Sequence, residues 1–527
     1  MLRLCLGLTA LGVCVSCVEV RPEVRVYETM SLVEQHTGHR PAWLSPWDDL
    51  PPAEWDGRGV LAEAHAVELA LRNNRALRAE VERIGMANAD LVQAGLLTNP
   101  VISFMVMFPL DGGRSMLRGP GFPMVALQDL WLIPARENVA RGELQQAILR
   151  VSDLAVETAQ NVRRVYARLQ YTQRALELIG ENITLVEQTT KIVQARQTAG
   201  RATQVELNLS LIRQHRLRSD LLAMEAEHRR LKRELLMLVG FAAASDDWAV
   251  APMHEIETAV RPPAPEEQLV GLGTLQRLDL KASEWEVRSA DRRVALATRE
   301  AWPDFALGLS FERAEGARMN TPGVASTLGT AAAAGAAGAI TGMPAMPPGT
   351  MRERADEPSP WMLGPMLELE IPIFDQNQAQ IARAVHERRR AEAEYEARLQ
   401  EITRDVRAAR ILQQQAYEQV LLYRNSILPD VQRNLELAQQ TYIGGQEDLA
   451  IFFQVQEDVI ATRLRTLELL RDYAVYLADL QRAVGGPLEL PGEAPALPAS
   501  PPPTSAPASA PEPEAEPPPP EDADVRE

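Results

Sequence analysis

The sequence predicts a mixed fold of long α-helices and transmembrane β-strands, in which one unit is duplicated and each chain contributes four strands. Three observations predict it. Two stretches of about 60 residues have helical composition and almost no proline. Two segments alternate apolar and polar residues with a period of two. Landmark residues of the first half return in the second half at fixed offsets.

The N-terminus indicates export. Arg3 precedes a short apolar stretch from Leu4 to Val15, which cannot span a bilayer and is typical of a secretory signal. It ends at Val15-Ser16-Cys17, which resembles a bacterial lipobox, although Cys14 stands where that motif usually has Leu. The resemblance implies acylation of Cys17 and, because Val18 follows, sorting to the outer membrane. Ordinary signal cleavage near Cys17 is the alternative.

The formal net charge of −18 argues against a nucleic-acid partner, which would need a basic surface. Part of this charge is local, because the tail from Leu488 to Glu527 contains nine acids and one base. Pro, Ala and Glu dominate the tail and cannot bury enough apolar surface to offset the entropy of ordering. We therefore predict a disordered extension.

The duplication aligns at two offsets. Pro303 lies 203 residues after Pro100, and Gly445 lies 245 residues after Gly200. The difference of 42 residues indicates an insertion in the second half, and the Gly/Ala/Pro-rich sequence from Glu312 to Pro360 is the candidate. Each half then reads as helix, strand, loop, strand, long helix, turn and returning helix.

The long helices are expected from Arg136 to about Gln197 and from Gln376 to Gln440, the second with an interruption at Pro429. Apolar residues of the last helix recur at spacings of three and four from Phe452 to Ala483, which indicates a coiled-coil seam. Gly200 and Gly445 interrupt the helical patterns where each chain should reverse.

Alternation defines the strands. Phe305, Leu307, Leu309 and Phe311 alternate with smaller or polar residues, as do Leu367, Leu369, Ile371 and Ile373. A soluble antiparallel sheet would show the same alternation. In a membrane, four strands would leave two bare edges, so closure requires other copies of the chain; three copies would give twelve strands.

These observations divide the chain into ten segments. They are 1–16, a signal peptide; 17–60, a lipid-anchored N-terminal extension; 61–96, the helix of the first repeat; 97–135, membrane strands 1 and 2; 136–240, the first helical hairpin; 241–265, a linker; 266–300, the helix of the second repeat; 301–375, membrane strands 3 and 4 with a long loop; 376–486, the second hairpin; and 487–527, the disordered tail.

Three motifs resemble the lipoprotein branch of the TolC-type outer-membrane efflux factors: Leu369 to Phe374 leading to Ala379-Gln380-Ile381, Tyr442 to Leu449, and Asp472-Tyr473 leading to Leu480–Gly486. The resemblance covers roughly Leu61 to Pro487. It implies a homotrimer with a twelve-strand β-barrel continued by an α-helical barrel of coiled-coil hairpins. It also implies a location in the outer membrane of a Gram-negative bacterium, with a large periplasmic portion. The implied partners are outer-membrane lipid, a periplasmic membrane-fusion adaptor and an inner-membrane efflux pump of the resistance-nodulation-division type.

The family places its entrance and adaptor-docking grooves at the hairpin tips. Carried over, the resemblance implies docking or gating residues at both tips, and the alternative is that the glycines only cap helices. Glu447 stands where the family often has an Arg that locks the closed entrance. The candidates are Arg196, Gly200, Thr203, Tyr442, Gly445, Glu447 and Asp448.

Alternation also predicts acids that face the lumen. If Leu367 and Leu369 face lipid, Glu368 and Glu370 face inward, and alignment of the repeats places Asp129 opposite Glu368. Rings of three such carboxylates would favour cations. The alternative is that these acids only keep the lumen wet.

Other functional classes are a periplasmic coiled-coil scaffold or tether and an outer-membrane exit duct for protein secretion. An enzyme is not expected, because no His-Glu-x-x-His, Gly-x-Ser-x-Gly or phosphate loop occurs. The pair His36 and His39 lacks further metal ligands nearby and is expected in a polar loop, so we predict neither metal nor cofactor. Ten of the sixteen methionines fall in the strand–loop segments, where they could serve metal export or fill apolar space.

Overall fold

The computed structural model describes residues 23–43, 55–99, 105–107, 116–242, 247–253, 260–314, 361–443 and 449–488. The chain divides into two compact units, Met1–Pro487 and Leu488–Glu527, and every described helix and strand lies in the first. In chain order the elements are α2 (Glu23–Thr37), β1 (Gly59–Leu61), α3 (Glu63–Asn73), α4 (Arg75–Ala94), β2 (Met105–Met107), β3 (Met116–Ala126), α5 (Asp129–Thr198), α6 (Gln204–Leu238), β4 (Trp248–Val250), α8 (Glu266–Gln276), α9 (Leu278–Arg299), β5 (Asp304–Ala314), β6 (Trp361–Glu370), α11 (Gln378–Leu422), η1 (Tyr423–Ile427), α12 (Leu428–Ile443) and α13 (Leu449–Val484).

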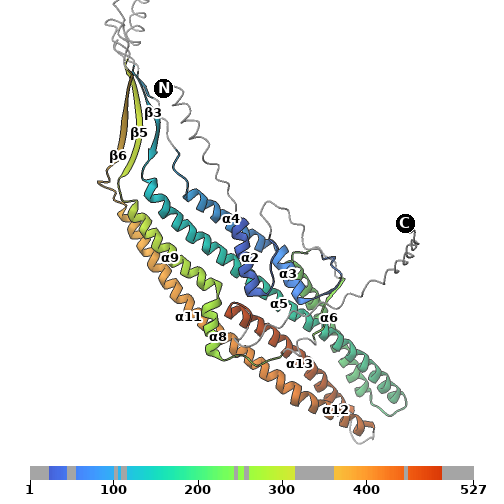
Figure 1. Cartoon of the computed structure of the whole chain (residues 1–527). Coiled ribbons are helices and arrows are strands. Elements are labelled where there is room, and N and C mark those ends of the chain that lie inside the picture. The colour runs from blue at the N-terminus through green and yellow to red at the C-terminus, as the bar shows by residue number, and fades with distance from the viewer. Residues whose placement is uncertain are drawn as a thin grey trace, which may run out of the picture. The chain divides into compact units, whose positions relative to one another are not determined.

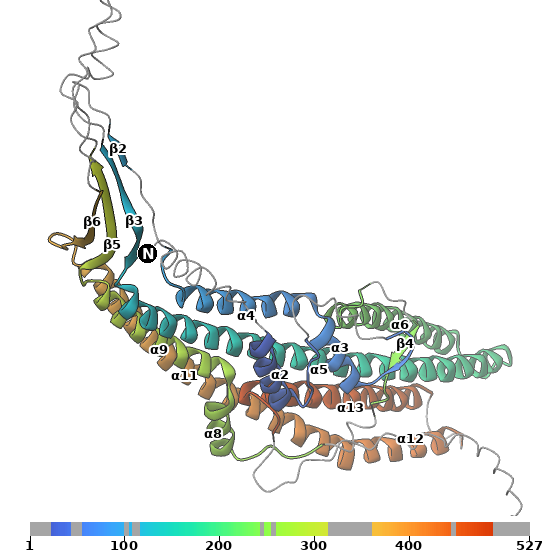
Figure 2. The ribbon, with the colours of Figure 1, turned by 45° about the horizontal axis from the view of Figure 1, so that its top comes forward.

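Four helices lie side by side in the order α4, α5, α9 and α11 next to the sheet (Figure 1). Farther from the sheet, α5 continues beside α6, and α12 continues α11 beside α13, so that two helical hairpins lie next to each other (Figure 2). Both predicted hairpins are therefore present. Among the described residues, no helix is long and apolar enough to cross a membrane.

Helix α5 has 70 residues, which corresponds to about 105 Å at 1.5 Å per residue. It begins at Asp129 rather than at the predicted Arg136, and Pro134 lies inside it. This proline is within the first two turns, where its missing N–H removes only one backbone hydrogen bond. The second long helix is interrupted where expected: the N–H of Leu428 bonds the carbonyl of Tyr423, five residues back, just before Pro429. This π-helical turn lets the helix continue.

The helix predicted before each pair of strands is in fact two helices. A single residue with extended backbone separates them, Asn74 at φ −61° and ψ 117° and Arg277 at φ −58° and ψ 123°. These positions are 203 residues apart, so the structure repeats the break as well as the sequence. A break of one residue barely disturbs the apolar periodicity, which is why the pattern predicts one helix.

The two helix breaks explain why glycine occurs at positions 240 and 485. A Cβ added to Gly240 would lie 2.5 Å from the carbonyl oxygen of Asn73, and one added to Gly485 would lie 2.9 Å from the Cα of Arg277. Both glycines also have positive φ, +81° and +90°. Each returning helix therefore ends against the break of its own repeat, where only glycine fits.

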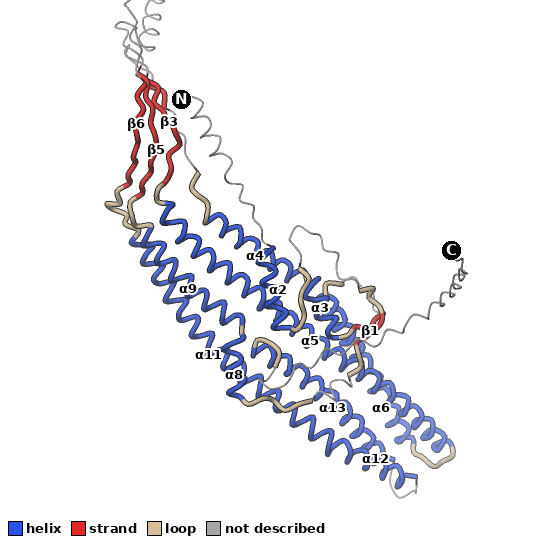
Figure 3. The backbone as a smooth tube through the Cα atoms, in the orientation of Figure 1, coloured by secondary structure: helices blue, strands red, loops and turns tan. Residues whose placement is uncertain are grey.

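The sheet has the antiparallel order β2-β3-β5-β6 and lies at one end of the helices (Figure 3). In its register Phe305 pairs with Leu369 and Leu307 with Leu367, so these apolar side chains share one face. The alternation that predicted β5 and β6 is confirmed. Strand β6 ends at Glu370, however, so Ile371 and Ile373 lie beyond it.

The N-terminal region contains structure that the sequence does not reveal. Helix α2 buries Val26, Met30 and Val33 in the main core, together with residues of α3, α4, α5 and α6. Strand β1 pairs in parallel with β4, which joins the predicted extension to the predicted linker. Strands of three residues are too short to show a period.

Candidate functional site

The tip of the first hairpin is a tight, fully capped reversal. Gly200 has φ +71° with open space around it. Its N–H bonds the carbonyl of Gln197 at 2.9 Å, and Arg201 N–H bonds the carbonyl of Arg196 at 2.7 Å. This is a Schellman ending, in which the left-handed residue is normally glycine.

The next helix begins with a capping box. Thr203 Oγ1 accepts from Glu206 N at 3.2 Å, and Thr203 N donates to Glu206 Oε1 at 3.4 Å. The predicted residues Arg196, Gly200 and Thr203 thus share one turn. Their capping roles account for Gly200 and Thr203, and docking or gating stays a prediction for all three.

The second tip is only partly described. Helix α12 ends at Ile443 and α13 begins at Leu449, so Tyr442 lies in the last turn of α12. Gly445, Glu447 and Asp448 lie outside the described residues, as does Cys17.

A partly buried arginine joins the two hairpins near their tips. Arg213 of α6 donates from Nη1 to the carbonyl oxygen of Phe453 at 2.7 Å, in the first turns of α13. Its guanidinium carbon lies 5.5 Å from the centre of the Phe453 ring, and Nη1 is 3.8 Å from Glu457. Nη2 is buried without a hydrogen-bond partner, and burial lowers the pKa of Arg213. The sequence gives no sign of this contact because its partners are 240 residues apart.

Ion pairs join the two halves near the helix breaks. Arg482 of α13 binds Asp153 of α5 through two bonds of 2.7 and 2.8 Å. Burial lowers the pKa of Arg482, but its hydrogen bonds to Asp153 and the negative charges of Asp153, Glu157 and Asp279 together outweigh burial, so the net shift of the pKa is upward. Arg277 binds Asp279 at 2.6 Å and Asp405 at 3.4 Å. Such paired, hydrogen-bonded charges stabilise the packing of the helices around the two helix breaks.

His36 lies in this region and not in a polar loop, so that prediction is wrong. It is in the last turn of α2, is 8% exposed, and its Nδ1 lies 2.6 Å from the carbonyl oxygen of Gly485. Burial lowers the pKa of His36 because the charged imidazolium is poorly solvated there. Among the described residues no group of three or more His, Cys, Asp or Glu side chains could hold a metal ion.

The predicted acids occupy two different environments. Asp129 is 1% exposed in the first turn of α5, and its carboxylate accepts from Thr98 N at 2.7 Å and from Arg136 at 3.4 Å. The prediction that it lies opposite Glu368 is wrong, because the chain has left the sheet at Ala126. Acids in a first helical turn are stabilised by the helix dipole.

Glu368 and Glu370 are exposed on β6, where Glu368 pairs with Ala306 and Glu370 with Asp304. Their side chains share a face opposite to that of Leu367 and Leu369. Asp304 therefore joins them, an acid that the sequence analysis missed because it stands at the first position of its strand.

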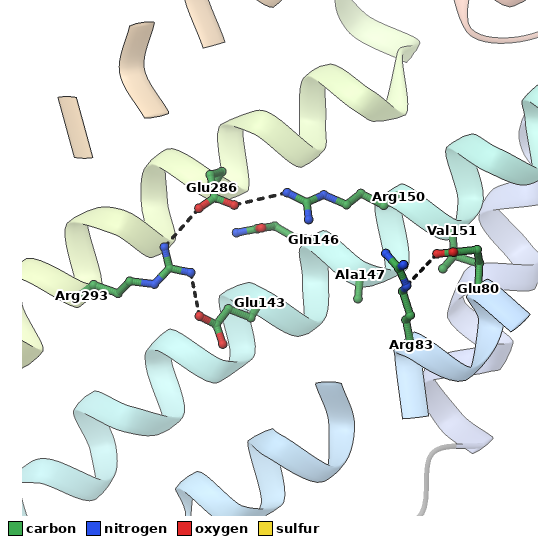
Figure 4. A pocket seen from close by; sticks show the side chains of 9 residues that line it. All are labelled: Glu80, Arg83, Glu143, Gln146, Ala147, Arg150, Val151, Glu286 and Arg293. Atoms are coloured by element: carbon green, nitrogen blue, oxygen red, sulfur yellow. Dashed lines mark hydrogen bonds and ion pairs between the residues drawn. The ribbon is translucent and has the colours of Figure 1, made fainter. Parts of the chain in front are cut away.

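A pocket of about 270 Å³ lies between α4, α5 and α9 (Figure 4). Arg293 bridges Glu143 at 2.7 Å and Glu286 at 3.1 Å, and Glu286 also accepts from Arg150 at 3.4 Å. Arginines and glutamates balance, so the pocket favours neither anions nor cations, and its ion pairs between helices join α5 to α9. Its lining residues are Glu80, Arg83, Glu143, Gln146, Ala147, Arg150, Val151, Glu286 and Arg293.

Comparison with known proteins gives a family and a fold. Residues 272–486 match the family described as Outer membrane efflux protein. No curated protein sequence matches the chain. Similar solved structures include a membrane protein from Pseudomonas aeruginosa, with 18% identity, a TM-score of 0.61 and coverage of 84% of this chain and 99% of that one. CusC has 18% identity and a TM-score of 0.63, and the match covers 85% of this chain and 99% of that one. The open-state MtrE outer membrane channel of Neisseria gonorrhoeae has 17% identity and a TM-score of 0.60, and the match covers 80% of this chain and 88% of that one.

At these identities the solved structures show the fold, which is that of TolC-type channels. The family match is confined to residues 272–486, the part of the chain that contains the three motifs quoted above, and there it agrees with the resemblance that they predict. The family match and the shared fold both support an outer membrane efflux channel.

Proposed function

We propose that this chain is the outer-membrane duct of a tripartite efflux system, through which substrates delivered by a periplasmic adaptor and an inner-membrane pump leave the cell passively. The observation that carries the proposal is the four-stranded sheet at the end of the helical hairpins. Three features of this sheet and these hairpins support it.

The sheet needs partners. In the described part of the chain, β2 pairs only with β3, and β6 only with β5, so both edges have unpaired backbone groups. In lipid each such group costs several kcal/mol. Pairing β6 of one copy with β2 of the next removes both edges, and three copies close a barrel of twelve strands.

The faces of the sheet suit a membrane. Leu363, Leu367 and Leu369 are exposed on one side of β6, where lipid would cover them. Glu368, Glu370 and Asp304 then line the lumen, and threefold symmetry makes each of them a ring of three carboxylates. Such rings favour cations. Acylation of Cys17 would anchor the chain in the same membrane.

The tip of the first hairpin is rigid enough to dock a partner. The capped turn around Gly200 holds its backbone through three hydrogen bonds, so little ordering entropy is lost on binding. We assign adaptor docking and gating to this turn and to the segment from Tyr442 to Asp448. With Glu447 in place of an arginine, an ionic lock of the usual kind would not form there.

Conductance decides between this proposal and a scaffold without a pore. Purified protein should produce ion-conducting steps in planar bilayers, and a scaffold should produce none. In a salt gradient, Glu368→Gln with Glu370→Gln should shift the reversal potential toward zero. Glu28→Gln with Glu34→Gln is the matched control, since it removes two carboxylates from α2, away from the sheet. An unchanged potential in the first variant would place the selectivity filter at the helical tips instead. Whether polypeptides or metal ions leave through the same duct is then tested by measuring their export from cells that contain the chain together with its partner pump.

A further inference from the structure

Strand β6 is followed by an ordered apolar loop that leads to α11. Ile371 is 63% exposed, Ile373 67% and Phe374 93%. Polar residues, Asp375 to Gln378, follow at once. Figure 2 shows the loop projecting sideways from the junction between β6 and α11. Three large apolar side chains within four residues at this exposure are unusual in a connection, which is normally polar.

Hydrogen bonds fix the loop in this position. Asn377 adopts the left-handed conformation at φ 60°, and its Nδ2 donates to the carbonyl of Ala297 at the end of α9, at 2.8 Å. Its N–H bonds Asp375 Oδ1 at 2.9 Å, and Gln378 Nε2 reaches the carbonyl of Phe374 at 3.3 Å. The hydrogen-bonded turn therefore keeps the apolar side chains exposed.

The loop follows directly on the strand that carries the apolar face of the sheet. Ile371 and Ile373 follow Leu367 and Leu369 at the same two-residue interval. On this face Trp131 packs edge-on against Phe305, with ring centroids 6.3 Å apart, and Phe305 pairs with Leu369. Aromatic rings at one level of a lipid-facing surface are typical of the boundary between acyl chains and headgroups.

We propose that Ile371, Ile373 and Phe374 form a lipid-binding loop that inserts into the headgroup–acyl boundary of the membrane leaflet nearest the helices. The inference rests on the proposed function, since it requires the apolar face of the sheet to meet lipid. A second copy of the chain is the competing occupant. A neighbouring strand, however, pairs along the edge of β6, in the plane of the sheet, and leaves the face of the sheet free.

Site-specific fluorescence tests the loop in the full chain. Phe374→Cys is labelled with an environment-sensitive fluorophore and reconstituted into phosphatidylethanolamine–phosphatidylglycerol vesicles that contain nitroxide-labelled phospholipid. The parent chain, treated in parallel, gives the background from its own cysteines. We expect loss of emission at position 374, stronger for a nitroxide near the headgroup than for one deep in the acyl chains.

Two labelled positions of similar exposure separate the outcomes. Leu367→Cys, on the strand face, should be quenched most by the deep nitroxide, and Leu437→Cys, on α12, should not be quenched; the parent residues are 64% and 59% exposed. Quenching at 367 without quenching at 374 would overturn the lipid-binding loop and leave the channel intact. A blue-shifted but unquenched label at 374 would assign the loop to a second copy. Absence of quenching at both positions would refute the membrane placement of the sheet itself.

Discussion

Removing the side chain of Arg213 should loosen the two hairpins from each other near their tips. Arg213 makes two contacts with the other hairpin close to the first tip. It donates a charge-assisted hydrogen bond to the Phe453 carbonyl at 2.7 Å, and its guanidinium stacks on the Phe453 ring. Arg213→Ala removes both at once. The carbonyl of Phe453 keeps its place in the α13 helix, so the substitution leaves no new buried acceptor without a partner.

The magnitude follows from the contacts. A hydrogen bond from a charged group contributes about 1.5–3 kcal/mol, and the contact between cation and ring about 0.5–1 kcal/mol. The pair with Glu457, which is 65% exposed, adds little. Against these stands the buried Nη2 without a partner, which costs about 1–3 kcal/mol. We expect a net loss of about 1–2 kcal/mol, or roughly 5- to 30-fold more local opening.

Amide hydrogen exchange measures this opening. Amides of residues 453–460 in α13 should exchange faster in Arg213→Ala, with the helix breaks near Arg277 unaffected. Arg218→Ala is the control, because Arg218 also lies on α6 but pairs with Glu187 inside its own hairpin. Equal exchange in the parent chain and in Arg213→Ala, or an equal effect of the control, would refute the reasoning.

Two further predictions concern stability. Gly200→Ala should lower the free energy of unfolding by about 1 kcal/mol, because Gly200 has a positive φ. Gly180 lies in mid-helix with nothing near an added Cβ, so Gly180→Ala should raise the free energy of unfolding by about 0.5–1 kcal/mol. Chemical denaturation should show these opposite signs. Because burial lowers the pKa of His36, the unfolded chain binds the proton first as pH falls, so stability should drop below about pH 6.5. His36→Gln should flatten this part of the pH profile, and an unchanged profile would assign the loss to other groups.

Local patterns predicted much of the fold. Glycine and proline mark the reversals and the π-helical turn, and the two-residue alternation marks β5 and β6, because these features depend on neighbouring residues. The break at Asn74, the start of α5 at Asp129 and the pairing of β1 with β4 depend on contacts across the chain. Asp129 shows the limit best: its sequence context resembles a strand end, but it is the first residue of α5, and its carboxylate accepts a hydrogen bond from the distant Thr98 N–H.

The candidate sites divide in the same way. The turn around Gly200 was predictable because a left-handed residue between two helices requires glycine. Arg213 was not, since nothing near it in sequence distinguishes it from the other arginines of α6. Long-range pairs of this kind require the fold to be known first.

Two of the polar links between the hairpins differ in strength, and the difference bears on where the hairpins can separate. Near the helix breaks, Arg482 and Asp153 form two short bonds and are each at least four-fifths buried; each such charge-assisted bond contributes about 1.5–3 kcal/mol. Near the tips, Arg213 contributes a net of about 1–2 kcal/mol, since one of its nitrogens is buried without a partner. A force that separates the hairpins therefore breaks the tip contact first and leaves the region around Arg482 closed. If the chain has the proposed function, adaptor binding at the tips would need to supply only the smaller of the two free energies to open the entrance.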